Sequence, residues 1–336
     1  MAENQEPFFI VGAMRSGTTL LRLMLAAHSR IVIPPESHFI PHLYFEEKRL
    51  GGLGGVRPKV VEWLIAHPRL ADFHLEPGFF REAVGTLEPF QTRTIVETIF
   101  GEFARRHGKL RWGEKTPWYR AVVPELAELI PEARFIHILR DGRDTALSAR
   151  RSSFGPATWA GAAYLWRDSV RDAWNGLGRI PKSRTLELRY EDLLLAPEKT
   201  LRSVCDFLQE KYEPQMLEFS RQAGELVPAW ESHWHAKLAG QLDPNNAGKW
   251  KRELTAAEVL LFQQVASPEL LRAGYELQPV SAGAATQLRI KTQMMQDRVR
   301  HSLGQCHKFL DDRRNRGFKI PPAWRAVKPG TSADKE

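Results

Sequence analysis

The sequence predicts an α/β protein with a central parallel sheet flanked by helices. Strand-like and helix-like segments alternate over the first two hundred residues, which is typical of parallel strands joined by helical crossovers. An apolar strand at 8–12 leads directly into a glycine-containing loop and an apolar helix at 17–27. With 336 residues, 43% of them hydrophobic, the chain can form one large domain, or a domain with an appendage.

The remaining elements follow in order along the chain. A short apolar stretch at 31–33 predicts the second strand, and residues 38–109 are mostly helical in pattern. This long insertion is placed where a lid or a substrate wall would be. Further elements are predicted from the same patterns: strands at 110–113, 134–139 and 185–190, and helices at 145–151, 159–177 and 198–209.

The loop after the first strand has the spacing of a phosphate-binding loop. Residues 12–19 read Gly-Ala-Met-Arg-Ser-Gly-Thr-Thr, which matches G-x-x-x-x-G-K-[ST] at all fixed positions but one. Thr18 replaces the lysine that reaches the β- and γ-phosphates, which argues against ordinary ATP or GTP hydrolysis. The backbone N–H groups still suit an anion, and Arg15 and Ser16 add side-chain donors. We therefore expect a phosphorylated nucleotide from which a group other than the γ-phosphate is transferred.

A second anion-binding pattern begins at Arg140. Arg140 ends a strand, and Ser148 lies about two helical turns further on, so both side chains can converge on one phosphate. Two separated anion sites suit a nucleotide that is phosphorylated at both ends. No strand ends in the apolar-run-plus-Asp pattern of a Mg²⁺-holding loop, because Arg140 precedes Asp141. The sequence therefore requires no metal.

Taken together, the two motifs resemble those of sulfotransferases that use 3′-phosphoadenosine 5′-phosphosulfate (PAPS). The resemblance covers roughly residues 7–275 and is greatest to the branch with Arg-Ser-Gly-Thr-Thr loops, which includes tyrosylprotein and many bacterial sulfotransferases. It implies a P-loop NTPase-like sulfotransferase fold, with a domain at 1–280 and a basic helical extension at 281–336. It also implies sulfuryl transfer to a hydroxyl or, with less support, an amine.

The resemblance assigns the nucleotide-binding residues. It implies that the 3′-phosphate is held by Arg140 and Ser148, and that the 5′-phosphosulfate is held by Arg15, Ser16, Gly17, Thr18 and Thr19. Arg15 suits the leaving 5′-phosphate, because its planar fork matches phosphate oxygens and stays charged. Cytosolic sulfotransferases have lysine at this place, so their substrates are no guide here.

The acceptor must lose a proton, so a base is expected near the sulfuryl group. Glu36, in Pro-Pro-Glu-Ser-His after the second strand, is placed like the glutamate base of tyrosylprotein and some bacterial carbohydrate sulfotransferases. His38 is the alternative, since histidine is the base in cytosolic enzymes. In a purely structural interpretation, Glu36 caps the next helix and His38 packs beneath it. Lys115 resembles the lysine that contacts the sulfuryl oxygens, or is a solvated surface residue.

Other residues complete the predicted site. Gly248, Lys249 and Trp250 resemble the late glycine-containing segment that closes over the 3′-phosphate and adenine, with Gly248 N–H and Lys249 contacting the anion and Trp250 shielding it. Their alternative is an ordinary polar loop. Tyr190, after a strand, is placed where family members contact the nucleotide, or it packs in the core. Two tryptophans are candidates for an acceptor pocket, together with residues 38–109 and 221–247: Trp118 and Trp159.

Rival functions make different predictions. A P-loop nucleotide kinase or other phosphotransferase would bind ATP with Mg²⁺, and a non-catalytic nucleotide-binding adaptor would tolerate loss of Glu36 and Lys115. His233 and His235 are too few for a metal site without a carboxylate at a known spacing. No motif identifies the hydroxyl-bearing acceptor as a carbohydrate, lipid, peptide or small molecule.

The net charge of +8 is concentrated in the C-terminal segment. Residues 281–336 hold 12 Lys/Arg and 5 Asp/Glu, a net of +7, which leaves +1 for the rest and gives no indication of nucleic-acid binding by the core. A rough apolar helical face runs through this segment at Leu288, Met295, Val299, Leu303, Cys306 and Leu310. The segment predicts a helix docked on the core, or a contact with a homodimer partner, a peripheral anionic membrane surface or an acidic acceptor. Two cysteines and the lack of a signal-like or spanning apolar run predict a cytoplasmic protein without a membrane span.

Overall fold

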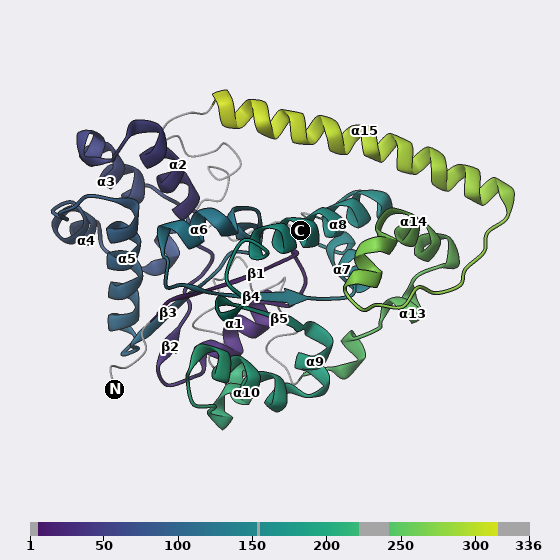
Figure 1. The fold of residues 1–336 in the computed structure, drawn as a ribbon, viewed down its shortest axis with the longest axis horizontal. Coiled ribbons are helices and arrows are strands. Elements are labelled where there is room, and N and C mark those ends of the chain that lie inside the picture. Colours follow the sequence, from purple (N-terminus) through teal and green to yellow (C-terminus); the bar gives the residue numbers. More distant parts are fainter. Residues whose placement is uncertain (1–5, 153–154, 222–241, 315–336) are drawn as a thin grey trace, which may run out of the picture.

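The computed structural model describes residues 6–152, 155–221 and 242–314, with side chains except those of 221 and 300–314. Five parallel strands form the central sheet in the order β2-β3-β1-β4-β5 (Figure 1). Their bounds are β1 Phe8–Gly12, β2 Ile31–Val32, β3 Arg111–Lys115, β4 Arg134–Leu139 and β5 Thr185–Arg189. The predicted parallel sheet is confirmed. β3 includes Lys115, which the sequence placed just beyond the strand.

Strand β1 is the centre of the sheet. Phe8 is paired with Gly113 of β3 on one side and with Arg134 of β4 on the other. The chain therefore continues to opposite sides of β1, and ligands of open α/β sheets bind beyond the carboxyl ends of the strands at such a switch point.

The alternation along β1 separates two apolar cores. Phe8 and Ile10 belong to the core with α1 (Thr18–Ala26), α9 (Tyr190–Leu195) and α10 (Pro197–Leu208). Phe9 and Val11 belong to the core formed mainly with the helical insertion. Because successive side chains of a strand point to opposite faces, both faces of the sheet are covered.

The insertion at 38–109 is mostly helical, as predicted. It contains α2 (Ile40–Leu50), α3 (Arg57–Ile65), α4 (Pro77–Phe79) and α5 (Thr92–Arg106), joined by short turns of 3₁₀ and π helix. Figure 1 shows these helices gathered at the β2–β3 end of the sheet, and α6 (Val123–Leu129) follows β3.

The helices after β4 form a third apolar core. It joins α7 (Gly142–Arg150), α8 (Trp159–Leu177) and α14 (Ala256–Arg272), while α13 (Trp250–Glu253) precedes α14. The stripe predicted on α8 is largely buried: Ala163, Trp166 and Val170 are almost fully covered, whereas Trp159 and Trp174 are half-buried.

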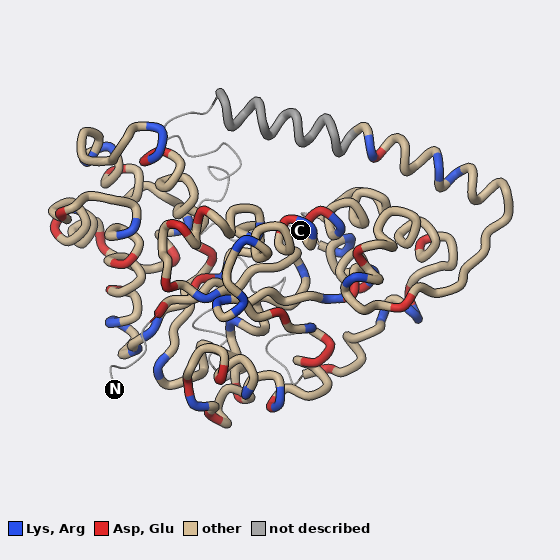
Figure 2. Tube along the Cα trace, viewed as in Figure 1, with Lys and Arg blue, Asp and Glu red and all other residues tan. Residues whose placement is uncertain are grey.

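The long C-terminal helix α15 (Ala284–Arg314) crosses α8 and α14 (Figure 1). Ile290 is buried and Met294 packs against the same core, whereas Leu288, Met295 and Val299 are exposed. The helix is docked on the core as predicted, but through Ile290 and Met294 and not through the predicted apolar face. Leu303, Cys306 and Leu310 of that face lie outside the described side chains. Figure 2 shows acidic and basic residues interspersed over the body of the protein.

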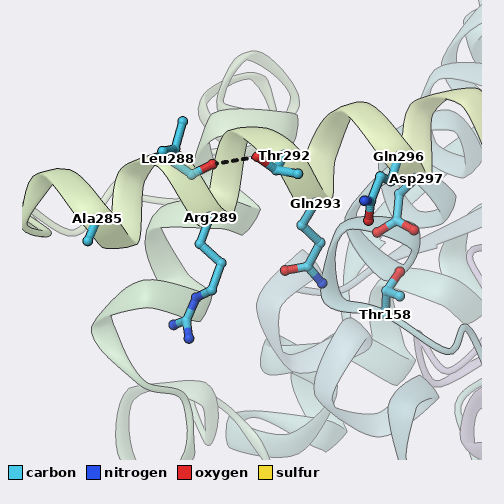
Figure 3. A pocket seen from close by; sticks show the side chains of 8 residues that line it. All are labelled: Thr158, Ala285, Leu288, Arg289, Thr292, Gln293, Gln296 and Asp297. Atoms are coloured by element: carbon cyan, nitrogen blue, oxygen red, sulfur yellow. Dashed lines mark hydrogen bonds between the residues drawn. The ribbon is translucent and has the colours of Figure 1, made fainter.

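An open cavity lies where α15 meets the start of α8. Its volume is about 640 Å³, and Arg289, Gln293 and Asp297 project from α15 on the side of Thr158 (Figure 3).

Candidate active site at the carboxyl ends of the strands

Every strand of the sheet ends beside a predicted site residue. The loop that begins at Ala13 follows β1, Glu36 lies four residues after β2, Lys115 ends β3, Arg140 follows β4 and Tyr190 follows β5. Since carboxyl ends of parallel strands meet at one edge, the sheet gathers residues from Ala13 to Tyr190 at a single edge.

The loop after β1 is shaped by two residues with positive φ. Arg15 has a φ of 66° and Gly17 a φ of 101°. A Cβ on Gly17 would lie 2.2 Å from the ring of Tyr190, so only glycine fits this position. Thr18 then begins α1, whose first N–H groups and positive dipole end favour an anion. Ser16 is fully buried, and its Oγ has no hydrogen-bond partner among the described residues.

The two predicted anion motifs contact each other directly. Arg15 Nε donates to Ser148 Oγ at 3.3 Å, across 133 residues of sequence. Arg140 Nη1 donates to the carbonyl oxygen of Arg15 at 3.1 Å, and its guanidinium lies 4.4 Å from the centre of the Tyr190 ring. Arg140 Nε is buried and has no partner within the described part of the chain. A buried donor without a partner is costly, and an anionic ligand would satisfy it.

The late glycine-containing segment is held differently from the prediction. Asp144 on α7 accepts hydrogen bonds from Gly248 N at 2.8 Å and from Trp250 N at 2.7 Å. Trp250 is buried with its ring 3.6 Å from the Arg143 guanidinium, and Lys249 is paired with Glu253 at 3.2 Å. In this arrangement Gly248 N and Trp250 N are bound to Asp144, and the predictions that Gly248 N–H and Lys249 contact the anion and that Trp250 shields it stay predictions.

This segment nevertheless adjoins the nucleotide motifs. Arg140 Nη2 donates to the carbonyl oxygen of Asn246 at 2.9 Å, so one guanidinium bridges the phosphate-binding loop and the late segment. Burial raises the pKa of Asp144, opposed by the charge of Arg140. Sequence reasoning missed Asp144, although it lies in the same Arg-Asp-Gly-Arg-Asp motif as Arg140.

The predicted base and the predicted sulfuryl-contacting lysine form an ion pair. Lys115 Nζ lies 2.5 Å from Glu36 Oε1, and His38 Nε2 lies 3.0 Å from Glu36 Oε2. Lys115 is 1% exposed and therefore is no solvated surface residue. Glu36 does not cap the next helix, since α2 has no side-chain cap. Burial acts to raise the pKa of Glu36, but the charge of Lys115 and the His38 hydrogen bond lower it well below its ordinary value.

Sequence reasoning missed a buried carboxyl group, Glu114, which binds the residues that follow Glu36 and Lys115 in the chain. Glu114 Oε1 accepts hydrogen bonds from Ser37 Oγ at 2.9 Å, from Ser37 N at 3.3 Å and from Thr116 Oγ1 at 2.5 Å. Ser37 Oγ also lies 3.0 Å from the hydroxyl of Tyr119. Burial raises the pKa of Glu114 to about 7. Its only signal in the sequence was its place beside Lys115.

The two tryptophans proposed for an acceptor pocket differ in their contacts. Trp118 is half-buried and donates from Nε1 to His38 Nδ1 at 2.8 Å. Trp159 packs at the third core, with the Arg150 guanidinium 5.4 Å from its ring centre. Trp118 therefore belongs to the network around Glu36.

The architecture and the paired motifs are matched by a known family. The family model described as "Sulfotransferase family" matches residues 7–214. The chain belongs to the sulfotransferase family. This confirms the resemblance and the fold that it implied.

Individual relatives are distant. A protein-tyrosine sulfotransferase A of Caenorhabditis elegans is 26% identical over 66% of this chain and 54% of its own length. A protein-tyrosine sulfotransferase of Drosophila melanogaster is 25% identical over 62% of this chain and 39% of its own. The chain thus spans about half or less of these two relatives. A solved sulfotransferase domain from the Synechococcus PCC 7002 olefin synthase is 27% identical, with a TM-score of 0.58 over 82% of this chain and 97% of that one.

The described residues lack two further features, a metal-binding group and a membrane-spanning helix. They contain no group of three or more His, Cys, Asp or Glu that could hold a metal ion, and His233 and His235 lie outside them. Within the same residues, no helix combines the length and apolar character needed to cross a membrane.

Proposed function

We propose that this protein transfers the sulfuryl group of PAPS to the hydroxyl of an acceptor, leaving adenosine 3′,5′-bisphosphate. One observation carries the proposal: the Glu36–Lys115 pair lies on the same sheet edge as the anion loop and Arg140. A proton acceptor and a cation thus accompany donors for two phosphates. The amine acceptor remains the less supported alternative.

The donors that lack partners fit a nucleotide with two anionic ends. Ser16 Oγ and the N–H groups at the start of α1 face one anion, assigned to the 5′-phosphosulfate. Arg140 Nε and the hydroxyl of Ser148 are assigned to the 3′-phosphate. Arg15 already bonds Ser148, so we assign it to the boundary between the two anions, where it stabilises the leaving 5′-phosphate.

Glu36 and Lys115 are assigned to the transfer step. A carboxylate held by Lys115 and His38 is a weak base, because both partners favour its ionised form. When sulfuryl oxygens draw the Lys115 ammonium toward them, Glu36 loses its closest positive charge and becomes a stronger base. The lysine thus couples stabilisation of the transferred group to removal of the acceptor proton.

The first test is calorimetric titration with adenosine 3′,5′-bisphosphate, with 5′-AMP and ATP·Mg²⁺ as comparison ligands. We expect metal-free binding of the bisphosphate that is much tighter than binding of 5′-AMP. A preference for ATP·Mg²⁺ would favour a phosphotransferase. Equal affinity for the bisphosphate and 5′-AMP would contradict the assignment of a 3′-phosphate site.

The second test follows labelled sulfate from [³⁵S]PAPS into candidate acceptors. Tyrosyl peptides come first, because curated relatives are named as protein-tyrosine sulfotransferases, and carbohydrates, lipids and small phenols follow. Transfer that is lost in Glu36→Gln and Lys115→Ala supports an enzyme. Unchanged function in both variants would instead support the nucleotide-binding adaptor.

A further inference from the structure

The contact between Trp118 and His38 fixes where the imidazole proton lies. The indole Nε1–H of Trp118 donates to His38 Nδ1 at 2.8 Å. An indole N–H can only donate, so His38 Nδ1 must be the unprotonated, accepting nitrogen. In a neutral imidazole the proton then lies on Nε2.

The other imidazole nitrogen faces the carboxylate. His38 Nε2 lies 3.0 Å from Glu36 Oε2, and an ionised carboxylate can only accept hydrogen bonds. The Nε2-protonated form satisfies both contacts at once. The opposite tautomer would place two donors face to face at Nδ1 and two acceptors face to face at Nε2.

We propose that Trp118 is a positioning residue that fixes His38 as the Nε2-protonated tautomer, so that His38 donates to Glu36 and is not itself the base. The catalytic role in this inference rests on the proposed function. The inference extends that function by deciding which of the two candidate bases, Glu36 or His38, accepts the proton. In this tautomer the only free electron pair of the ring is on Nδ1, where Trp118 uses it. Glu36 is left as the group that can accept a proton from the acceptor.

The backbone around both residues supports such a role. Trp118 lies in the turn Pro117–Val122, directly after the strand that ends in Lys115. Its ring also packs edge-on against Tyr119 with centroids 5.2 Å apart. His38 has a φ of 55°, an uncommon conformation for a residue other than glycine. A strained residue held on both ring nitrogens is typical of a site where orientation matters.

The decisive experiment reads the tautomer directly and needs no substrate. Protein labelled with ¹⁵N-histidine is examined by long-range ¹H–¹⁵N correlation at neutral pH, and the His38 signals are identified by their loss in His38→Gln. We expect the Nε2-protonated pattern in the unmodified protein. A predominantly Nδ1-protonated or doubly protonated His38 would overturn the inference, whatever the variants do.

The Trp118→Phe variant tests the cause. Phenylalanine keeps a ring and removes the N–H, so we expect His38 to become a mixture of tautomers. Trp159→Phe is the matched control, since Trp159 is also half-buried but its ring contacts the Arg150 guanidinium and not His38. An unchanged His38 pattern in folded Trp118→Phe protein would show that Trp118 does not fix the tautomer.

Kinetics separate positioning from pocket lining. With an acceptor found by the sulfate-transfer screen, we expect Trp118→Phe to lower kcat about tenfold with little change in the KM of the acceptor. An increase in KM at constant kcat would instead mean that Trp118 lines the acceptor pocket. The affinity for the bisphosphate, measured by calorimetry, should be the same in Trp118→Phe and the unmodified protein. A wrong nucleotide assignment would therefore appear in the calorimetry of the unmodified protein, whereas a wrong tautomer inference would appear in the His38 spectra.

Discussion

The two sides of the candidate site differ in whether their polar groups already have hydrogen-bond partners. The anion side comprises residues 13–19, Arg140, Ser148 and Tyr190, and the acid–base side comprises Glu36, His38, Lys115 and Trp118. On the acid–base side, both oxygens of Glu36 and both ring nitrogens of His38 have partners. On the anion side, Ser16 Oγ and Arg140 Nε are buried without partners among the described residues.

This difference separates binding from chemistry. An anion that enters the first side can satisfy Ser16 Oγ and Arg140 Nε, two donors without partners among the described residues, so these contacts form without breaking an existing hydrogen bond. On the second side, a proton or a sulfuryl oxygen must compete with the Lys115–Glu36 ion pair and the His38–Glu36 hydrogen bond, which already exist. Substitutions on the anion side should therefore change affinity for the nucleotide. Those on the acid–base side should change kcat or the free energy of unfolding.

The largest effect is expected on the acid–base side, from Glu36→Gln. The amide keeps the shape but cannot accept a proton, so kcat for sulfate transfer should fall about 1000-fold. Affinity for adenosine 3′,5′-bisphosphate, measured by calorimetry, should change little. Glu128→Gln is the control, because Glu128 pairs with Lys48 where both side chains are more than half exposed. Activity close to that of the unmodified protein in Glu36→Gln would reject Glu36 as the base.

The next effect concerns stability rather than catalysis. The pKa of Glu114 is raised by burial from 4.5 to about 7, so between these values the folded protein keeps a proton that the unfolded chain has released. The free energy of unfolding therefore falls as the pH rises through this window, by up to about 3 kcal/mol. Glu114→Gln cannot ionise and should lose this dependence.

Urea unfolding of both proteins between pH 4.5 and pH 8 measures the effect. The variant should match the unmodified protein at the acid end and be the more stable one at pH 8. Parallel stability curves for the two proteins would show that Glu114 does not carry a raised pKa. Glu88→Gln serves as control, since Glu88 is 76% exposed.

The anion side is tested by Arg140→Ala. Loss of a charged donor to the 3′-phosphate should weaken binding of the bisphosphate about 30-fold, or about 2 kcal/mol. Binding of 5′-AMP, which lacks that phosphate, should weaken much less. The exposed Arg151, paired with Glu253, provides the control Arg151→Ala. Equal losses for both nucleotides would mean that Arg140 only supports the loop through the carbonyl oxygen of Arg15.

The parts of this site that sequence could predict are those encoded in short spacings. Gly17 and Thr18 follow a strand and begin a helix, so their positions near an anion site follow from local geometry. Arg140 directly follows β4 and Ser148 lies on the helix that comes next, so their placement on one strand–helix unit could be predicted in the same way. Glu36 and Lys115 were each predicted from their places at strand ends, but the ion pair between them, across 79 residues, was not predicted.

The rest depends on partners that are distant in sequence. Asp144 accepts from Gly248, 104 residues away, and Glu114 accepts from Ser37, 77 residues away. No local pattern shows which carboxylate a loop N–H will meet, so the hydrogen bond from Gly248 N to Asp144 could not be predicted. The apolar periodicity of α15 likewise could not show that Ile290, rather than Leu288, faces the core.

The smallest effect is expected from Asp144→Asn, which tests whether the late segment belongs to the anion side. Asparagine keeps one accepting oxygen but turns its NH₂ toward a backbone N–H that the carboxylate had satisfied. We expect about fivefold weaker bisphosphate binding and faster hydrogen exchange at the amides of Gly248 and Trp250. Asp243→Asn, in the same segment, should have no effect because asparagine can still accept from Asn245 N. If hydrogen exchange becomes faster while affinity for the bisphosphate stays constant, Asp144 anchors the segment but the segment does not contribute to nucleotide binding. Arg140 would then be the last residue of the chain that belongs to the anion side.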